Sequence, residues 1–596
     1  MGGSLLIWLA MPAGGAETVL VPAGSMWCYL DDGSDPGTAW AQQGFDDSGW
    51  RAGKAELGYG DAAERRPEAT VVSFGSSPTN KFITTYFRHR FQVPAKLRFV
   101  SARLRLLRDD GAVVFLDGSE ADRSNMPDGA IGYRTLASSS VAEPEEAAFD
   151  SSELDAALLT PGAHVLAVEV HQAGATSTDL SFDLELRVSD RPTVLRGPYL
   201  QQMTPTSAIV RWRTDSPTDS RAIYGATDGM LTNLIVDRTL TNEHLVAISG
   251  LAPDTLYHYG VGTSGSLLAA GTDYWFRTAP TPGSRRPTRI WVLGDFGFGS
   301  ADERAVRDSY LRYARRHPAD VWITLGDNEQ TSGADRRYQK VLFDTYGDLL
   351  RQLTMWPTLG NHDVNGARRG TASTPYLRIF SLPTKGETGG VPSGTEQYYS
   401  FDYANVHCIC LDSQASDRSS QGAMARWLHH DLTATRQDWV IAFWHHPPYS
   451  KGSHDSDKDR QMTEMRQNIV PILEQHDVDL VLCGHTHVYE RSYLVYGHYG
   501  DSTTLLPSML VDRGDGREDG TGVYHKSRAH GTAGTVYVNA GVGGRAAKGK
   551  VEHPVMRVTL RQLGFVMLEV NGLRLDGRFI NVKGEVRDHF TVLQSP

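Results

Sequence analysis

The sequence predicts two N-terminal β-sandwiches followed by a larger α/β unit. Up to about residue 280, short segments with alternating apolar residues are separated by turns rich in Gly and Asp, as in β-sandwiches. Beyond that point, apolar runs alternate with segments of helical periodicity, which is typical of a largely parallel sheet. With 596 residues, the chain is long enough for several cores and roughly four domains.

The first β-sandwich is predicted to span residues 17–190. Segments 112–117, 165–170 and 180–188 have the composition of strands. The second is predicted over residues 191–281, where segments 207–212 and 255–261 alternate well. Around Tyr257 this unit resembles a fibronectin type III sandwich, which implies a structural role for Tyr257 as its corner tyrosine.

The first residues predict a secretory signal over residues 1–16. An apolar run at 5–11 is followed by Gly14, Gly15 and Ala16, although no Lys or Arg precedes it. The alternative is an ordinary apolar strand. No later run reaches the roughly 18 apolar residues of a membrane span. We therefore expect a secreted, periplasmic or extracellular protein without a membrane span.

Charge and cysteine content narrow the function classes further. The net charge of -11 argues against a nucleic-acid partner, because such binding depends on an excess of Lys and Arg. Cys408 and Cys410 share one face of a predicted strand, and Cys483 lies inside another. Together with Cys28 they predict free thiols without a disulfide framework.

Five apolar runs in the α/β unit each end in a polar cluster. The clusters are Gly294-Asp295, Gly326-Asp327-Asn328, Gly360-Asn361-His362-Asp363, His445-His446 and Gly484-His485-Thr486-His487. Ligands of open α/β sheets collect beyond the carboxyl ends of the strands. Carboxylate, amide and imidazole groups at these positions therefore predict a metal site.

The candidate metal ligands are two carboxylates, one amide and three imidazoles. They are Asp295, Asp327, Asn361, His445, His485 and His487. This set suffices for two metals if one carboxylate bridges them. Two adjacent metals are a common arrangement for the hydrolysis of phosphate esters, which predicts a small phosphate ester as the substrate.

The five clusters match, in order, the motifs of the calcineurin-like metallophosphoesterases. The segment 485–491 and the preceding β unit look like those of purple acid phosphatases, so that the resemblance covers about residues 190–596. It implies an αββα-sandwich metallophosphoesterase domain over residues 282–596.

The resemblance also implies roles for single residues. Asp295, Asp327 and His487 would hold the first metal, and Asp327 would bridge. Asn361, His445 and His485 would hold the second metal. His362 and His454 would face the substrate phosphate as catalytic residues. Asp363 would orient His362, and Glu490 and Arg491 would form an ion pair that braces the histidine loop.

One position departs from the family pattern. Purple acid phosphatases have a Tyr that binds Fe(III) where this chain has Gln330, and other members have a His where it has Gly297. Gln330, Glu329 or a water would have to replace that ligand. We therefore expect a colourless enzyme with two divalent ions such as Zn, Mn or Fe(II), and a neutral optimum.

The sequence thus predicts a secreted two-metal hydrolase of phosphate monoesters. A phosphodiesterase or nucleotide hydrolase with the same site is an alternative. Segments 45–50, 59–61 and 108–118 resemble those of galactose-binding-like jelly rolls, and the resemblance covers about residues 17–190. It implies a glycan or cell-surface contact, whereas a packing or spacer role is the simpler interpretation. A weakly active protein that binds surface glycans through this unit is the third hypothesis.

Overall fold

The computed structural model describes residues 17–60, 68–95, 99–141, 146–364, 374–527, 533–547 and 552–595. The predicted signal segment 1–16 lies outside these residues. The chain forms two compact units. One is a β unit that extends to Thr193 and includes Thr214–Thr218, and the other is an α/β unit of Val194–Arg213 and the chain from Asp219 onward.

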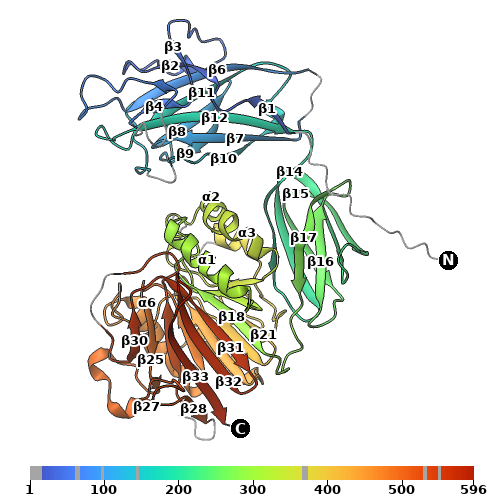
Figure 1. Cartoon of the computed structure of the whole chain (residues 1–596), viewed down its shortest axis with the longest axis vertical. Helices are drawn as coiled ribbons and strands as arrows, with labels where there is room; N and C mark the ends of the chain where they lie inside the picture. Colours follow the sequence, from blue (N-terminus) through green and yellow to red (C-terminus); the bar gives the residue numbers. More distant parts are fainter. Residues whose placement is uncertain are drawn as a thin grey trace, which may run out of the picture. The chain divides into compact units, whose positions relative to one another are not determined.

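The β unit consists of two six-stranded sheets (Figure 1). The first contains β10 (Asp150–Leu154), β7 (Ser101–Arg108), β12 (Leu180–Ser189), β4 (Leu57–Tyr59), β5 (Thr70–Val71) and β1 (Glu17–Val21). The second contains β3 (Arg51–Lys54), β2 (Met26–Leu30), β6 (Thr84–Val93), β11 (Gly162–His171), β8 (Gly111–Leu116) and β9 (Ser119–Ser124). Side chains of both sheets, such as Leu104, Leu184 and Val168, share one buried core. This alternation of inward apolar residues gives an all-β sandwich.

A five-stranded sheet begins the α/β unit. It contains β13 (Val194–Gln201), β14 (Ser207–Gly225), β16 (Leu256–Gly262), β17 (Leu267–Arg277) and β15 (Asn233–Ser249). The hydroxyl of Tyr257 accepts the backbone N–H of Ala252 at 3.0 Å, a contact typical of a corner tyrosine. The fibronectin type III assignment remains a prediction. Buried Arg196 anchors this sheet to the rest of the unit through an ion pair with Asp335 at 2.9 Å.

Two seven-stranded sheets make up the rest of the α/β unit. One contains β20 (Met355–Pro357), β19 (Val321–Thr324), β18 (Thr288–Leu293), β31 (Gly564–Asn571), β32 (Arg574–Asn581), β33 (Val586–Ser595) and β28 (Tyr524–Ser527). The other contains β21 (Tyr399–Tyr403), β22 (Val406–Cys410), β23 (Trp439–Trp444), β24 (Leu480–Cys483), β29 (Val536–Ala540), β25 (Tyr489–Ser492) and β30 (Met556–Leu560). A short pair, β26 (Leu494–Val495) and β27 (Leu510–Asp512), is separate from both. Ile290, Trp322 and Ile441 belong to one core that includes residues of both large sheets.

Helices cover the outer faces of these sheets. The helices are α1 (Ala301–Ala314), α2 (Asp335–Tyr338), α3 (Asp344–Leu350), α4 (Pro375–Ile379), α5 (Ala423–Ala434), α6 (Arg460–Glu464) and α7 (Val470–Gln475). On the first sheet, Tyr310 of α1 stacks on Trp291 with ring centroids 3.8 Å apart. On the second, Leu428 of α5 and Leu473 of α7 share a core with strand residues. The result is the predicted α/β arrangement of two sheets between helices.

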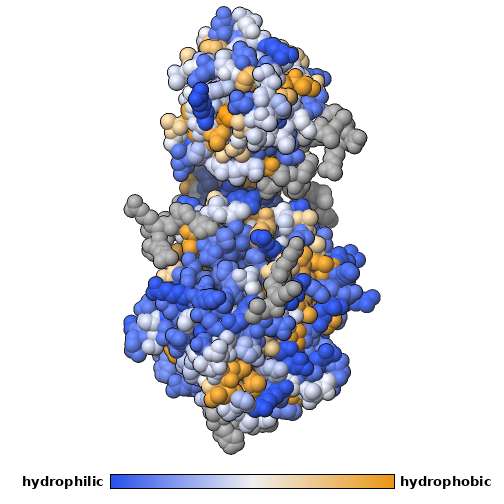
Figure 2. Space-filling view, turned by 90° about the vertical axis from the view of Figure 1, so that its left-hand side faces the viewer, coloured by the Kyte–Doolittle hydropathy of each residue, from blue (hydrophilic) through white to orange (hydrophobic). Residues whose placement is uncertain are grey.

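The surface and the four cysteines of the structure are as expected from the amino-acid composition. Figure 2 shows a largely hydrophilic face with apolar side chains in small groups. Among the described helices, none is long and apolar enough to cross a membrane. Cys28, Cys408, Cys410 and Cys483 are all free, as predicted.

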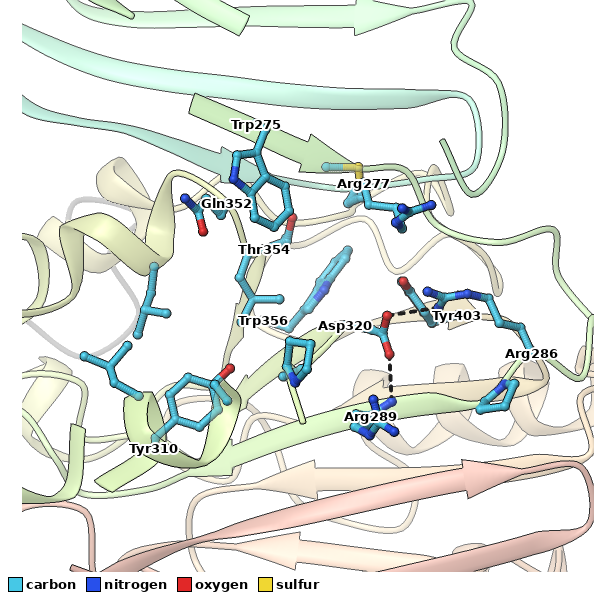
Figure 3. A pocket seen from close by; sticks show the side chains of 18 residues that line it. Trp275, Arg277, Arg286, Arg289, Tyr310, Asp320, Gln352, Thr354, Trp356 and Tyr403 are labelled. Carbon is cyan, nitrogen blue, oxygen red and sulfur yellow. Dashed lines mark hydrogen bonds and ion pairs between the residues drawn. The ribbon is translucent and has the colours of Figure 1, made fainter. Parts of the chain in front are cut away.

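A pocket of about 520 Å³ lies between β17 and the start of the first large sheet (Figure 3). Trp275, Trp356 and Tyr310 line it. Its one acid, Asp320, accepts hydrogen bonds from Arg286 Nη1 and from the backbone N–H of Arg289, both at 2.9 Å. None of the predicted ligands lines this pocket, so the site lies elsewhere.

A buried ion triad links β21, β22 and α5. His407 Nδ1 lies 2.7 Å from Asp402 Oδ1, and its Nε2 lies 2.9 Å from Asp431 Oδ2. Burial alone would lower the pKa of His407, but the two carboxylates raise it from 6.5 to about 9. The imidazolium form therefore stabilises the fold.

We predict that the stability of the protein falls as the pH rises from 6.5 to 9. Because its pKa is raised in the folded state, His407 contributes fully to the free energy of unfolding below its unfolded pKa. This contribution is lost as the pH rises through the folded pKa, and it amounts to at most about 3 kcal/mol. Urea unfolding at several pH values would measure this slope. In a His407→Gln variant the slope over the same window should be smaller, and an unchanged slope would contradict the assignment.

Candidate metal centre

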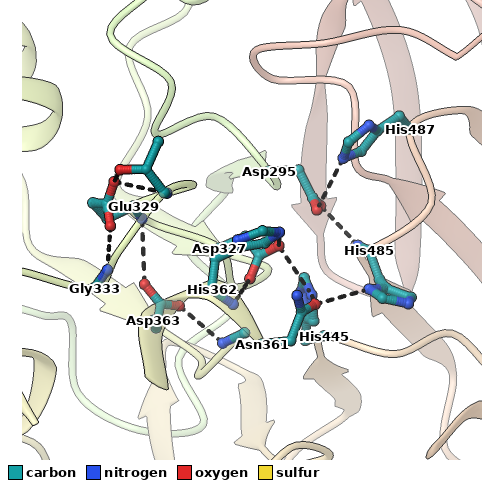
Figure 4. Close-up of polar contacts among 12 residues, drawn as sticks. Asp295, Asp327, Glu329, Gly333, Asn361, His362, Asp363, His445, His485 and His487 are labelled. Atoms are coloured by element: carbon teal, nitrogen blue, oxygen red, sulfur yellow. Dashed lines mark hydrogen bonds and ion pairs between the residues drawn. The ribbon is translucent and has the colours of Figure 1, made fainter. Parts of the chain in front are cut away.

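The six predicted ligands all follow strand ends of the two large sheets. Asp295, Asp327 and Asn361 follow β18, β19 and β20, and His445, His485 and His487 follow β23 and β24. Because β18–β20 pair in parallel, and β23 and β24 do likewise, the carboxyl ends meet at one edge of each sheet. Figure 4 shows that the side chains of both groups converge.

One part of the centre is built around Asn361. Its Oδ1 lies 3.0 Å from His445 Nε2 and 3.1 Å from His485 Nδ1. His445 Nε2 also lies 3.5 Å from Asp327 Oδ2. The other nitrogen of His445, Nδ1, lies 2.8 Å from the carbonyl oxygen of Leu325. A carbonyl only accepts, so that Nδ1 carries a proton.

The other part is built around Asp295. Its Oδ1 lies 3.7 Å from His487 Nε2, and its Oδ2 accepts the backbone N–H of His485 at 2.8 Å. Atoms of Asp295, Asp327 and His445 that could bind one metal lie within 4.8 Å of one another. The structure therefore brings all six predicted ligands together.

The backbone at the centre adopts conformations that L-residues rarely use. Asp295, Asp327 and His485 have φ values of 52°, 50° and 64°. The preceding glycines permit close approach of these turns. A Cβ atom on Gly360 would lie 2.1 Å from Asp327 Oδ1 and 2.2 Å from Asp327 N. This packing explains why four of the five clusters begin with glycine.

The two predicted substrate-side histidines lie beside the ligands. His362 donates its backbone N–H to Asp327 Oδ1 at 2.9 Å, and its side chain is 36% exposed. The exposed His454 stacks on His485 with ring centroids 3.9 Å apart. Both side chains can therefore meet a ligand that enters from solvent.

Sequence reasoning missed Asp459, whose Oδ2 lies 3.7 Å from His485 Nε2. It begins α6 and accepts the backbone N–H of Met462 at 3.1 Å. An N-cap aspartate is common in any sequence, so nothing marked this one out. Asp459, His454 and His485 form a second group of potential ligand atoms within 4.8 Å.

The electrostatics of the centre suit a cation. Burial raises the pKa of Asp327, but His445 and His362 lower it more, so that it falls below 3.8. Burial lowers the pKa of His445, whereas Asp327 and Asp295 raise it to about 9. Asp295 Oδ1 and His485 Nε2 are buried without a hydrogen-bond partner. Buried carboxylates with unused ligand atoms beside imidazoles fit divalent metals.

Glu329 is engaged by the loop that follows it. Its carboxylate accepts the backbone N–H groups of Thr331 and Ser332, both at 2.8 Å. Gly333 and Arg337 also donate to it. Of the three candidates to replace the family's Tyr or His ligand, namely Gln330, Glu329 and a water, Glu329 is therefore the least available.

Asp363 has several partners, and its predicted role in orienting His362 stays a prediction. Its carboxylate accepts the backbone N–H groups of Asn328 at 3.1 Å and Gly360 at 2.9 Å, and the hydroxyl of Tyr338. Asp363 therefore joins the second and third polar clusters. The predicted ion pair between Glu490 and Arg491, in contrast, was wrong.

These two residues have separate partners. Arg491 pairs with Asp588 at 2.6 Å, and Glu490 accepts a hydrogen bond from Asn539 Nδ2 at 2.8 Å. Neighbours in a strand point to opposite faces, so that adjacent side chains cannot easily meet. Both residues still anchor β25, which follows the histidine loop.

Gly297 has no room for the histidine of other family members. A Cβ atom there would lie 2.1 Å from the backbone oxygen of Asn328. The backbone N–H of Gln330 donates to the carbonyl of Gly297 at 3.0 Å, which keeps the two loops together. The Gln330 side chain is 6% exposed, and its Nε2 has no hydrogen-bond partner.

Comparisons with known proteins agree with this geometry. Residues 288–489 match the family model described as calcineurin-like phosphoesterase, and residues 198–278 match that of the purple acid phosphatase N-terminal domain. Residues 288–489 form a calcineurin-like phosphoesterase domain.

Plant purple acid phosphatases are similar to this phosphoesterase over about half of its chain. Probable purple acid phosphatase 20 of Arabidopsis thaliana is 28% identical over 347 residues, 55% of this chain and 75% of that protein. Purple acid phosphatase 23 of the same plant is 29% identical over 46% of this chain and 62% of its own length. The structure of purple acid phosphatase PPD1 from yellow lupin seeds shares the fold, with a TM-score of 0.57, 16% identity and coverage of 86% of this chain and 94% of that one.

We predict that Gly360→Ala lowers phosphatase activity at least about 100-fold, because the new methyl group displaces Asp327. Gly347→Ala is the matched control. Gly347 lies within α3 with nothing near its Cβ position, so that alanine should preserve activity and stability. Rates with p-nitrophenyl phosphate and metal content would be measured for both. Full activity of Gly360→Ala would refute the predicted role of this packing.

Proposed function

We propose that this phosphoesterase hydrolyses phosphate monoesters with two divalent metal ions. Its class, a metal-dependent phosphatase, follows from its family. Support for two ions comes from the convergence of six ligand side chains with unused buried atoms on Asp295 and His485. Asp295, Asp327 and His487 would hold the first ion, and Asn361, His445 and His485 the second, with Asp327 shared.

Two metals at such a site polarise phosphoryl oxygens and supply a hydroxide nucleophile near neutral pH. The chain orients its own groups for this chemistry. The bond between His445 Nδ1 and Leu325 O turns the lone pair of Nε2 towards Asp327 and Asn361. His362 and His454 would bind the phosphate from the solvent side and donate a proton to the leaving oxygen.

Divalent ions are favoured because no phenolate is available at the first position. Gln330 replaces the family tyrosine, and Glu329 is occupied by its own loop. Fe(III) is stabilised by hard anionic ligands, whereas Zn, Mn and Fe(II) accept carboxylate and imidazole. The Gln330 oxygen or a water would complete the first site.

We also propose that the protein acts outside the cytoplasm, as a secreted or periplasmic enzyme. The apolar run at residues 5–11 and the small residues after it support this location. The β unit is proposed to serve as a spacer, with a glycan or cell-surface contact as the alternative.

We predict about two metal ions per chain and no visible absorption band. Elemental analysis of protein purified without chelator, with a visible spectrum, would test both points. A visible charge-transfer band from a phenolate to Fe(III) would overturn the assignment to divalent ions. One ion or none after supplementation with Zn, Mn and Fe(II) would overturn the two-metal site.

We predict that a monoester such as p-nitrophenyl phosphate is hydrolysed faster than its bis-ester at neutral pH. Asp327→Asn should lower kcat at least about 100-fold, because it removes the negative charge that both ions would share. Asp348→Asn is the control, since that carboxylate is 93% exposed on α3. A preference for the diester would favour the phosphodiesterase alternative. Normal activity of Asp327→Asn would refute the proposed site.

A further inference from the structure

Three carboxylates of the β unit gather at one end of its first sheet. Asp109 follows β7, Asp179 precedes β12, and Glu146 lies between β9 and β10. Strands β7 and β12 are antiparallel neighbours, and Asp109 donates its backbone N–H to Ser181 O at 3.1 Å. One oxygen of each carboxylate lies within 4.8 Å of the others. The sheet pairing therefore places these acids together.

Asp109 is buried in an unusual way. It is 1% exposed, and neither carboxylate oxygen has a hydrogen-bond partner. Within the described ranges, no Lys or Arg forms an ion pair with Asp109 or Asp179. A buried carboxylate without a partner is strongly unfavourable, so that either a proton or a cation must neutralise it.

The proton is the competing explanation. Burial, together with the nearby carboxylates of Asp110 and Asp179, raises the pKa of Asp109 to about 9 in the absence of a cation. Asp110 itself has ordinary partners, because it accepts the backbone N–H groups of Val141 and Ala173 at 2.7 Å. The unusual acid is therefore Asp109 alone.

A further oxygen without a donor lies beside Asp179. Gln172 follows β11 and is fully buried. Its Nε2 donates to the backbone oxygen of Asp179 at 2.8 Å and to the hydroxyl of Tyr59 at 3.1 Å. Its Oε1 has no hydrogen-bond partner. Gln172 thus offers an amide oxygen close to the backbone of Asp179, and amide and carboxylate oxygens are the ligand types that Ca²⁺ prefers.

We propose that Asp109, Glu146 and Asp179 bind a Ca²⁺ ion in the β unit, apart from the metal centre of the α/β unit. The ligand group contains no imidazole or thiolate, which disfavours Zn²⁺. Ca²⁺ takes six to eight oxygen ligands in flexible geometry, so that Gln172, backbone carbonyls or waters can complete the shell. Mg²⁺ requires a tighter octahedral arrangement. The ion would link the segment before β10 to the ends of β7 and β12.

Calcium binding and thermal unfolding of the full chain would test this site. In wild-type protein treated with a chelator and then reloaded with Zn²⁺, 1 mM CaCl₂ should raise the unfolding temperature of the β unit by about 5 °C. Calorimetric titration with CaCl₂ should show one more ion per chain in the wild type than in Asp109→Asn. Phosphatase activity should be equal in both, because the cluster lies outside the metal centre.

The controls separate a cation from a shared proton. Asp128→Asn removes an exposed acid of the same unit and should respond to Ca²⁺ like the wild type. Asp109→Asn should lose the response, and Glu146→Gln, in a partly exposed segment, tests the site again should the first variant not fold. No response of the wild type to Ca²⁺, with a stable Asp109→Asn variant, would overturn the proposal in favour of a protonated Asp109. Equal stabilisation by MgCl₂ would overturn the assignment to Ca²⁺.

Discussion

Two buried carboxylates, Asp295 and Asp327, set the requirements that the α/β unit meets. They are 0% and 2% exposed, and isolated buried charges of one sign are strongly unfavourable. The surrounding strand ends place three imidazoles and one amide oxygen beside these two carboxylates. The four groups come from two different sheets. This is possible only because the parallel strands of both sheets end on the same side of the molecule. The sheet topology therefore places polar and cationic groups where they can offset the charge of the buried carboxylates.

The packing around these acids is as restrictive as their charge. Asp295, Asp327 and His485 have left-handed backbone conformations, which cost free energy of order 1 kcal/mol or more each. The glycines beside them leave no space for a side chain, as at Gly360. Such strain persists only where the surroundings determine the conformation. The two sheets and their helices supply that rigid frame, and the ligands are therefore held in place before any metal arrives.

The features of the metal centre that follow a repeated sequence pattern were predictable from the sequence. Buried strands that end in polar clusters are visible as a periodic pattern, and all six predicted ligands lie together in the structure. Contacts between distant or unpatterned residues were not predictable. Arg491 pairs with Asp588, which is 97 positions away. Asp459 is an N-cap without a motif, and Asp363 has the same local sequence whether it orients a histidine or joins two loops. The acids of the β unit escaped notice because only strand pairing brings Asp109 to Asp179.

The cost of burying a carboxylate without a partner applies to the metal centre and to the acids around Asp109, but the neighbouring groups differ between the two. In the α/β unit the carboxylates face imidazoles, and His445 gains a proton there when no metal is present. A metal that displaces such protons must accept nitrogen ligands, which selects ions such as Zn or Mn. In the β unit the candidate ligand group of Asp109, Glu146 and Asp179 consists of carboxylates alone, which suits a proton or a hard cation. Because carboxylate oxygens bind Zn less well than imidazoles do, the two proposed sites would select different kinds of ion.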